Sequence, residues 1–597
     1  MKKFTNFEIA RLLRNVAVSY QLKDEKKYRF QIIAYNKAAD AIEVSPVQLQ
    51  DIYLEEEKLD KISGVGPSIA AHIQELFNKG RVDHFQDIMK GVPEAIFPLL
   101  DVPNFGPKKA YKIVSIFKLS DPDTVTEEVE KLANSGRIAE LEGFGKKSEE
   151  DLLTGITQFK EGKTKSNRMA LPFAHAIGEQ IVDYLKKNPK VKRVEMLGSL
   201  RRMRDTIGDV DLAVASNDAG NVIDYFVKYP RIERLIEKGP VSASFVANGG
   251  AQIDLMVQSE KRFGALLQHF TGSKQHNVAL RERAVRSGFS LSERGIKEVK
   301  SGRLHEFANE KDFYKFLGLP YIEPELREDR GEIDAALRQA QGKFPGLPKL
   351  IEVTDIKGDL HTHTNFNIEP SHDLGKNSMQ EMTEKARSMG YEYIGFADHN
   401  PSTSGHNADD ITKLIKKRGK EIEHLNESNK DVRVYNLLEI DILPNGDLPL
   451  NNEQLNMLEG AIVSLHSAFT QDREKITQRI LKGLSHPKVR IFGHPTGRLI
   501  NSRAGADADW DSIFSFCRQE DIALEINSAS QRLDLSDVMV KRAIEAGCRV
   551  IIDTDSHSVE GFSMMKYGVA VARRGWCEKR NVVNTLPGKE FEKWMLK

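Results

Sequence analysis

Apolar residues recur every three or four positions along the first 165 residues of the chain. Stretches such as NFEIARLLRNVAVSY at 6–20 and SIAAHIQELFNKG at 68–80 place their apolar side chains on one helical face. From about 167 to 258 the period changes to two, in VKRVEMLGS, DVDLAVAS and AQIDLMVQ. The pattern therefore predicts a helical N-terminal region followed by a sheet.

The second half of the chain has a different rhythm. Residues 259–322 return to helix and loop, and the Pro- and Gly-rich stretch GKFPGLPKLIEVTD at 342–355 is typical of a linker. From 356 to the end, short apolar strands alternate with amphipathic helices, the order of an α/β barrel. We therefore expect five domains, at 1–85, 86–166, 167–258, 259–322 and 356–597, with a linker at 323–355.

The composition fits a multi-domain protein of the cytoplasm. The chain has 597 residues, 40% of them hydrophobic and 29% charged, and this length exceeds what one hydrophobic core supports. No stretch approaches the roughly 18 uninterrupted apolar residues of a membrane span. Three cysteines are too few for a disulfide framework, which indicates a reducing compartment. No long apolar heptads occur, so we expect a monomer.

Three glycine-containing phrases recur in the helical region. They are ISGVGPSIAAHI at 62, VPNFGPKKAYKI at 102 and LEGFGKKSEEDL at 141, and they resemble helix-hairpin-helix units. In such a unit a tight turn directs backbone N–H groups at the start of a helix towards a phosphate, without base readout. Asn104 replaces the first glycine of the second phrase, and asparagine tolerates the left-handed conformation. The glycines that we expect at DNA are Gly64, Gly66, Gly106, Gly143 and Gly145.

Two carboxylates lie two positions apart in GSLRRMRDTIGDVDLAVAS, residues 198–216. Along a strand Asp209 and Asp211 point to one face, and the apolar residues beside them point to the other. Asp254 lies on a second alternating strand. Three such carboxylates favour a site for two divalent cations, because a bound cation keeps neighbouring carboxylates ionised. We therefore expect Mg²⁺ or Mn²⁺ at these catalytic residues, and an in-line phosphoryl transfer.

The residues around this pair complete a more specific phrase. Gly198 and Ser199 would supply donors to a triphosphate, with Arg202 as a charged clamp. The phrase G-S-x-R-R-x(5)-G-D-x-D, which includes Gly208, together with a later strand aspartate is the nucleotidyltransferase palm signature. From residue 1 to about 322 the chain resembles a family X DNA polymerase. The resemblance implies deoxynucleoside triphosphates and gapped or primer-template DNA as substrates.

The resemblance extends to FGALLQHFTGSKQHNVALRERA at 263–284, which matches the family's thumb helix and turn. It implies residues that bind the incoming nucleotide and the template. They are His269 and Phe270 at the sugar, Gly272 in the turn, Asn277 and Arg281 at the base pair and the template side, and Arg168 at the triphosphate.

Two departures from the family pattern bear on activity. Met256 stands where family members commonly carry an arginine that could pair with Asp254, so gating is expected to differ. In the first hairpin His72 replaces the lysine that forms a Schiff base in lyase-competent relatives, and Ser68 replaces a basic residue that helps to hold a 5′-phosphate. A neutral imidazole cannot form that imine, so we expect weak or absent deoxyribose-phosphate lyase activity.

Histidines and carboxylates follow the apolar runs of the last domain. Ten of the sixteen histidines lie there, and successive runs end in DLHTHT, YIGFADH, VYNLLEID, AIVSLHS, RIFGHPTG and VIIDTDSH. In a barrel of parallel strands all strand C-termini open onto one face, so these side chains converge. Mixed imidazole and carboxylate ligands suit Zn²⁺ or Mn²⁺ better than Mg²⁺ alone. The candidate ligands are His361, His363, His399, Glu439, His466, His494, Asp555 and His557.

This set resembles the polymerase and histidinol phosphatase (PHP) domain, a distorted seven-stranded barrel with three metal ions. Relatives complete the third metal site with an aspartate in a short loop, which is longer here and reads NFNIEPSHDLGKNS. Asp373 is our choice for this ninth ligand, and His372 is the alternative. The resemblance implies one ion at His361, His363, Glu439 and Asp555, a second at Glu439, His466 and His494, and a third at His399 and His557.

The sequence thus predicts a multi-domain α+β and α/β fold. A helical helix-hairpin-helix region precedes a nucleotidyltransferase palm with a thumb, and a distorted (βα)7 PHP barrel forms the C-terminal part. In these terms the expected parts are a lyase-like domain at 1–85, fingers at 86–166, the palm at 167–258, the thumb at 259–322 and the PHP domain at 356–597.

These features favour a bacterial DNA repair polymerase that fills short gaps and trims 3′ ends with a metal-dependent 3′→5′ exonuclease. Ten basic residues against three acidic ones between Lys261 and Arg303 fit a phosphate backbone, although a solvated helix face would look similar. Two alternatives stay open. In the first, the polymerase is kept but the PHP domain acts on a small phosphate ester. In the second, the chain is a DNA-binding scaffold with weak sites.

Overall fold

A computed structural model of the chain describes residues 6–43, 65–102, 105–122, 124–160, 168–247, 251–469, 471–500 and 505–597, together with Phe4, Leu49, Tyr53, Leu59 and Arg503. The chain divides into two compact units. The first comprises residues 1–167 and 501–504, and the second comprises residues 168–500 and 505–597. Among the described residues, none of the helices combines the length and the apolar character that a membrane crossing requires.

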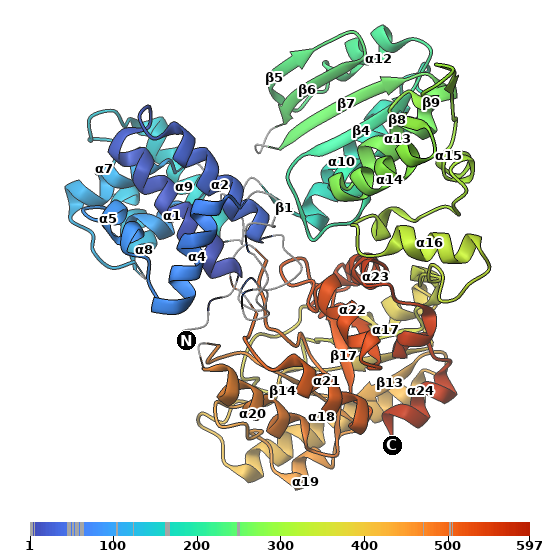
Figure 1. Ribbon diagram of the computed structural model, residues 1–597. Helices are drawn as coiled ribbons and strands as arrows, with labels where there is room; N and C mark the ends of the chain where they lie inside the picture. Colours follow the sequence, from blue (N-terminus) through green and yellow to red (C-terminus); the bar gives the residue numbers. More distant parts are fainter. Residues whose placement is uncertain are drawn as a thin grey trace. The chain divides into compact units, whose positions relative to one another are not determined.

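The first unit is built of helices (Figure 1). These are α1 (Asn6–Asp24), α2 (Arg29–Glu43), α4 (Pro67–Lys79), α5 (Asp83–Met89), α6 (Ile96–Leu99), α7 (Pro107–Phe117), α8 (Val125–Asn134) and α9 (Lys146–Lys160). Gly66, Gly106 and Gly145 directly precede α4, α7 and α9, so each recurring phrase leads into a helix. A proline follows Gly66 and Gly106 at the first helical position, where its missing N–H is no loss.

A five-stranded sheet begins the second unit. It contains β2 (Arg193–Met196), β4 (Val210–Ala215), β5 (Ile232–Lys238), β6 (Ser242–Ala247) and β7 (Gln252–Gln258), in the order β2-β4-β7-β6-β5. Leu212 and Leu255 pack in one apolar core with α10 (Leu171–Lys186) and α12 (Ala219–Phe226). Ala213 on the opposite face packs against α13 (Phe263–Thr271). Both faces of β4 are therefore covered, and its polar N-terminal end is held in a fixed position.

The segment after this sheet forms a small mixed subdomain. Buried His276 joins three of its helices, because its Nδ1 lies 2.6 Å from Glu332 Oε1 and its Nε2 lies 2.9 Å from the Tyr314 hydroxyl. The elements are α14 (Lys274–Arg286), β8 (Phe289–Ser292), β9 (Gly295–Glu298), β10 (Leu304–His305), α15 (Glu310–Phe316) and α16 (Glu332–Ala340), and the strands pair in the order β10-β9-β8.

The C-terminal α/β region, residues 356–597, alternates parallel strands with helices (Figure 1). Its strands are β11 (Gly358–Thr362), β12 (Tyr393–Phe396), β13 (Arg433–Asn436), β14 (Glu439–Asp441), β15 (Ala461–Ser464), β16 (Val489–Phe492), β17 (Ala523–Asn527) and β18 (Val550–Asp553). Its helices are α17 (Met379–Ser388), α18 (Ala408–Ser428), α19 (Asn452–Leu455), α20 (Arg473–Leu484), α21 (Trp510–Glu520), α22 (Asp537–Glu545), α23 (Met565–Arg574) and α24 (Gly588–Met595). Most strand residues are buried, as parallel strands covered by helices require.

The strand ladders of this region match the expected distorted barrel in strand order, without one closed ladder among the described strands. They form two parallel sheets, β11-β12-β13 and β14-β15-β16-β17-β18. Single parallel bridges, His399 to Glu439 and Thr362 to Ser556, connect the two sheets at both junctions. The described strands therefore follow the cyclic order of a barrel, but the regular ladder is interrupted where the strands are short and the polar residues begin.

Buried polar contacts of Arg574 join the C-terminal α/β region to the segments that carry Arg202 and Glu328. Arg574, at the end of α23, is 3% exposed. Its guanidinium donates to Arg202 O (2.7 Å), Glu328 Oε1 (3.0 Å) and Asp537 Oδ2 (2.7 Å). Burial alone would raise the pKa of Glu328, but Arg574 and Arg202 lower it to about 2. The stability that Glu328 contributes is therefore present above about pH 4.5 and is lost as the pH falls towards 2.

Arg574→Ala is expected to destabilise the second unit by about 3–5 kcal/mol, because two buried carboxylates lose a shared counter-charge. All three tryptophans lie in the C-terminal α/β region, so denaturant unfolding followed by tryptophan fluorescence measures the loss. Arg580→Ala removes an exposed pair with Glu578 and should change stability by less than about 0.5 kcal/mol. Equal midpoints for the two variants would contradict the prediction.

Candidate functional sites

Three carboxylates meet at the end of β4. One oxygen from each of Asp209, Asp211 and Asp254 lies within 4.8 Å of the others. Asp209 precedes β4, Asp211 lies on β4, and Asp254 pairs with Asp211 across the parallel ladder to β7. Ser244 on β6 donates to Asp254 Oδ1, and Gln252 Nε2 lies 3.0 Å from Asp254 Oδ2. The structure thus brings together the three residues that strand alternation singled out.

The electrostatics of this carboxylate site favour a bound cation. Burial raises the pKa of Asp211 to about 7, and the charges of Asp209 and Asp254 add to the rise. The pKa of Asp209 is raised as well, first by burial and then by Asp254. A divalent cation between the carboxylates would remove this repulsion and keep all three ionised. Oxygen-only ligands of this kind suit Mg²⁺ or Mn²⁺.

Glycines keep the space beside these carboxylates open. Gly198, the first residue of α11 (Gly198–Arg201), has φ +58°, and a Cβ there would lie 2.4 Å from Asp211 Oδ2. Ser199 follows it in the same short helix. Gly208 lies beside Arg168, since a Cβ there would be 3.4 Å from Arg168 Nη1. The expected triphosphate residues Gly198, Ser199, Gly208 and Arg168 therefore lie next to the three carboxylates.

Arg202 and Arg168 have protein partners of their own. The Arg202 guanidinium donates to Thr271 O and, through Nε, to Glu328 Oε1 at 2.9 Å. Arg168 Nη2 donates to Thr206 O at 2.7 Å. Sequence reasoning missed Glu328, because it lies 126 positions from Arg202 and no local pattern connects the two. Arg202 is therefore held in place, beside Gly272, before any triphosphate binds.

The expected nucleotide and template residues gather around His269. Asn277 Nδ2 donates to His269 O at 2.7 Å, and Arg281 Nη2 lies 3.3 Å from His269 Nδ1. The ring of Phe270 lies 4.8 Å from that of His269. Met256 pairs with Ala213 across the β4–β7 ladder and, with Phe270, packs against the apolar cluster on this face. It supplies apolar contact where an arginine would have supplied charge.

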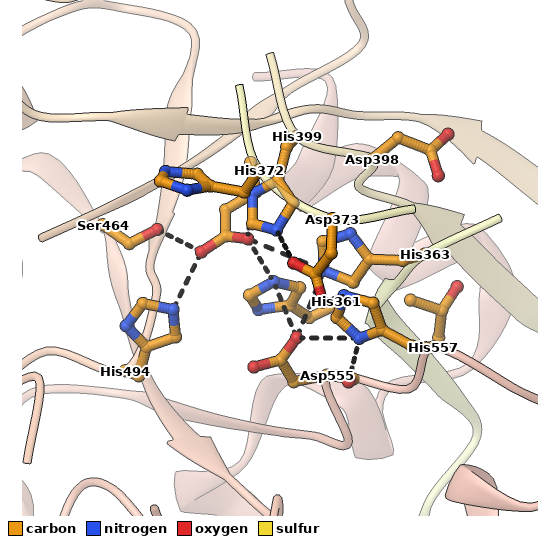
Figure 2. A network of polar contacts seen from close by, with 12 residues as sticks. His361, His363, His372, Asp373, Asp398, His399, Ser464, His494, Asp555 and His557 are labelled. Carbon is orange, nitrogen blue, oxygen red and sulfur yellow. Dashed lines mark hydrogen bonds and ion pairs between the residues drawn. The ribbon is translucent and has the colours of Figure 1, made fainter. Parts of the chain in front are cut away.

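The candidate ligands of the C-terminal α/β region converge on one centre, shown in Figure 2. Parallel strands explain this, because their C-terminal ends share one edge although the residues span about 200 positions. Groups of ligand atoms within 4.8 Å of one another occur there. They are His361, His363, Glu439 and Asp555; Glu439, His466 and His494; His363, His399 and His557; and His372, His399 and His466.

Glu439 lies in the middle of this centre and faces both sides. Its Oε2 is 3.2 Å from His361 Nε2 and 3.0 Å from His399 Nδ1. Its Oε1 is 3.2 Å from His466 Nε2 and 2.8 Å from His494 Nε2. Each oxygen therefore contacts a different pair of imidazoles, and a carboxylate that bridges two metal ions has this geometry.

The longer loop carries Asp373 and His372 to different places. Asp373 lies between His399 Nε2 (3.4 Å) and His557 Nε2 (3.5 Å). His372 instead has its Nε2 3.0 Å from Asp441 Oδ1. The geometry favours Asp373 over His372 as the companion of His399 and His557.

Several ring nitrogens at this centre are buried and, within the described part of the chain, make no hydrogen bond. An unpaired buried polar group costs about 1–3 kcal/mol, and coordination to a cation would remove that cost. Burial lowers the pKa of His363 to about 4, so its ring is neutral at pH 7 and offers a lone pair. The residues present therefore fit a divalent metal cluster. The unpaired nitrogens are His361 Nε2, His363 Nδ1 and Nε2, His399 Nδ1, His494 Nδ1 and His557 Nε2.

Sequence reasoning missed two carboxylates that orient the ligands. Glu525 Oε1 lies 2.6 Å from His361 Nδ1, and Asp441 Oδ1 lies 2.6 Å from His466 Nδ1. A carboxylate on the outer nitrogen fixes the ring and makes the inner nitrogen a better ligand. A signal existed, because Glu525 lies on the apolar strand ALEIN and Asp441 lies two positions after Glu439 on β14.

Comparison with known proteins decides the family of the chain. Over 590 residues it is 33% identical to "DNA polymerase/3'-5' exonuclease PolX" of Bacillus subtilis (strain 168), which covers 98% of this chain and 99% of that relative. The chain belongs to the PHP-containing family X DNA polymerases. The matching family descriptions are a helix-hairpin-helix domain at 4–82, a SAM-like helix-hairpin-helix tandem at 56–121, the DNA polymerase beta thumb at 266–328 and the PHP domain at 359–529.

More distant relatives are also named as DNA polymerases. DNA polymerase lambda of Rattus norvegicus is 25% identical over 353 residues, 54% of this chain and 56% of that one. DNA polymerase lambda of Arabidopsis thaliana is 22% identical over 331 residues, 49% of this chain and 57% of that one. The matches confirm the expected order of a helix-hairpin-helix region, a thumb and a C-terminal PHP domain. The helix-hairpin-helix and thumb domains indicate DNA binding.

In this family X polymerase, histidines and tyrosines form a cluster on the first hairpin. His72 on α4 stacks on His84, with ring centroids 4.9 Å apart. Its Nδ1 lies 3.0 Å from the Tyr35 hydroxyl, and His84 Nε2 lies 2.7 Å from the Tyr20 hydroxyl. Burial lowers the pKa of His72, and His84 lowers it further. Ser68 is exposed on the same helix.

The expected DNA-contacting glycines are only partly described. Gly66, Gly106 and Gly145 directly precede helices, and Gly143 has φ +80°. A positive φ of this kind is the conformation in which a hairpin turn favours glycine. Gly64 and Asn104 lie outside the described residues.

Proposed function

We propose that this protein fills short gaps in DNA by template-directed synthesis and trims 3′ ends as a 3′→5′ exonuclease. One observation carries the proposal: the chain holds a three-carboxylate cluster and a separate cluster of imidazoles and carboxylates. A relative at 33% identity has both activities in its name. We infer that the first cluster holds Mg²⁺ or Mn²⁺ and that the second holds three ions of Mn²⁺ or Zn²⁺.

At the three-carboxylate cluster, a primer 3′ hydroxyl would give up its proton to solvent water, and its oxygen would bond to the α-phosphorus of a deoxynucleoside triphosphate. The bond from that phosphorus to the bridging oxygen breaks, and pyrophosphate leaves. Bound divalent cations would supply charge neutralisation and activation of the 3′ hydroxyl. Gly198 keeps the Asp211 oxygen accessible, and Arg168 and Arg202 offer guanidinium donors to the triphosphate.

The cluster of imidazoles and carboxylates in the C-terminal α/β region is called the PHP centre here. At the PHP centre, a water oxygen would bond to the phosphorus of the last phosphodiester, and the bond from phosphorus to the 3′ oxygen breaks. The 3′ oxygen takes up a proton, and a nucleoside 5′-monophosphate leaves. Bound metal ions would lower the pKa of the attacking water. Glu439 holds the two sides of the centre together, while Glu525 and Asp441 fix the rings of His361 and His466.

A 5′-labelled primer on gapped duplex DNA tests both activities at once. With Mg²⁺ or Mn²⁺, the primer should lengthen when deoxynucleotides are present and shorten when they are absent. Absence of both changes would overturn the proposal. If the protein hydrolyses a small chromogenic phosphate and single-stranded DNA does not compete, the PHP centre is a small-ester phosphatase instead.

Deoxyribose-phosphate lyase activity should be weak or absent. The His72 imidazole cannot form the imine, and the nearby tyrosine hydroxyls offer no amine in its place. Borohydride trapping on a DNA with an incised abasic site should therefore give little covalent product. His72→Lys is the matched variant and should raise the yield if the rest of the pocket is intact. Efficient trapping by the natural protein would contradict this prediction.

A further inference from the structure

Arg532 approaches the PHP centre from the loop between β17 and α22. Its Nε lies 3.7 Å from Asp555 Oδ2, while Asp555 Oδ1 faces His361 and His363. The guanidinium therefore lies beside a carboxylate of the expected metal-ligand cluster.

Within the described part of the chain, the Arg532 guanidinium lacks a full set of hydrogen-bond partners. Its Nη1 is buried and has no hydrogen-bond partner among the described residues, and the side chain is 19% exposed. The 3.7 Å separation from Asp555 is too long for a hydrogen bond. Arginine carries five donors in a planar fork, and a buried cationic donor without an acceptor is unfavourable. The arrangement therefore favours an anionic acceptor with several oxygens.

The loop that carries Arg532 is held firmly. Arg498 donates through Nε to Arg532 O (2.9 Å) and through Nη2 to Leu533 O (2.5 Å). Asp534 accepts from Thr496 Oγ1 at 2.7 Å, and Arg532 N donates to Ala529 O at 2.8 Å. A side chain on a fixed backbone loses less entropy when it binds a ligand. Arg532 is thus preorganised at the edge of the metal-ligand cluster.

We propose that Arg532 binds the non-bridging oxygens of the phosphodiester that is cleaved at the PHP centre. This inference rests on the proposed exonuclease function. The planar guanidinium matches two phosphate oxygens, which a lysine ammonium at the same place could not do. Arg532 would hold the phosphodiester of the 3′-terminal nucleotide beside the residues that bind the metal ions. It would also neutralise charge that develops on the phosphate oxygens.

The test compares Arg532→Ala and Arg532→Lys with Arg542→Ala, which removes an exposed pair between Arg542 on α22 and Asp511 on α21. Calorimetric titration with thymidine 5′-monophosphate, a product of shortening, measures phosphate binding without turnover. Its Kd should rise about 10- to 100-fold for Arg532→Ala, since a charge-assisted hydrogen bond is lost, and less for Arg532→Lys. Metal content and thermal midpoint should match the natural protein. Added methylguanidine should restore part of the shortening by Arg532→Ala.

Two results would overturn the inference. A Kd and a shortening rate within about twofold of the Arg542→Ala control would show that Arg532 does not touch the phosphate. A loss of bound metal with no response to methylguanidine would show that Arg532 only supports Asp555. If the natural protein itself does not shorten DNA, the proposed function fails and this inference fails with it.

Discussion

Glu439→Gln is expected to abolish 3′ shortening, by about 10³-fold or more, because several kcal/mol of charge stabilisation are lost. Glutamine keeps the shape of the side chain but removes its charge and one acceptor oxygen. Burial alone would raise the pKa of Glu439, yet His361, His399 and His466 hold it well below its ordinary value. The carboxylate is therefore ionised at neutral pH, and its two oxygens face both sides of the centre.

Primer extension by Glu439→Gln should stay within about twofold of the natural protein, because the substitution is distant from the three-carboxylate cluster. The measurement is the length of a 5′-labelled primer with and without deoxynucleotides, together with bound metal by mass spectrometry. Glu474→Gln, an exposed change on α20, is the control and should alter neither activity. Shortening at the natural rate by Glu439→Gln would exclude this centre as the nuclease.

Asp254→Ala should remove primer extension by a similar factor and leave shortening intact. Asp254 lies directly opposite Asp211, so its loss removes one of three anionic ligands from a cation site that strand pairing fixes. The variant should fold normally, because the repulsion that raises the pKa of Asp209 and Asp211 falls. Reduced stability is therefore not expected to explain the loss.

Single-turnover extension on gapped DNA, with DNA binding followed by fluorescence anisotropy, separates these effects. Asp224→Asn removes an exposed pair between Asp224 on α12 and Lys238 on β5 and is the control. Binding should be unchanged in both variants, and extension should be lost in Asp254→Ala alone. Residual extension above about a tenth of the natural rate would mean that Asp254 is not a required ligand.

The site residues that could be predicted from the sequence are those whose direction strand periodicity sets. The period of two placed Asp209 and Asp211 on one face, and the polar residue after each apolar run pointed to the PHP centre. In both cases the backbone itself sets the direction of the side chain. Family resemblance added the ninth position, for which the structure favours Asp373.

The residues that the sequence did not reveal depend on contacts between segments that are distant along the chain. Glu328 holds Arg202 across 126 positions, and Glu525 holds His361 across 164. Arg532 lies in a loop, where no periodicity reports its direction. The sequence predicted a distorted seven-stranded barrel, but not where its ladder is interrupted. The strands are only three to five residues long, and such short strands leave gaps that a sequence pattern does not reveal.

The carboxylate of Glu328 is shared by arginines from opposite sides of the boundary between polymerase and nuclease. A shortened polymerase that stops in the linker would keep Glu328 and Arg202 but lose Arg574. Arg202, the proposed triphosphate ligand, would then lie beside Glu328, and that carboxylate would have lost part of its counter-charge. Such a fragment is a different enzyme from the polymerase half of the intact chain, and its nucleotide affinity does not stand for that of the whole.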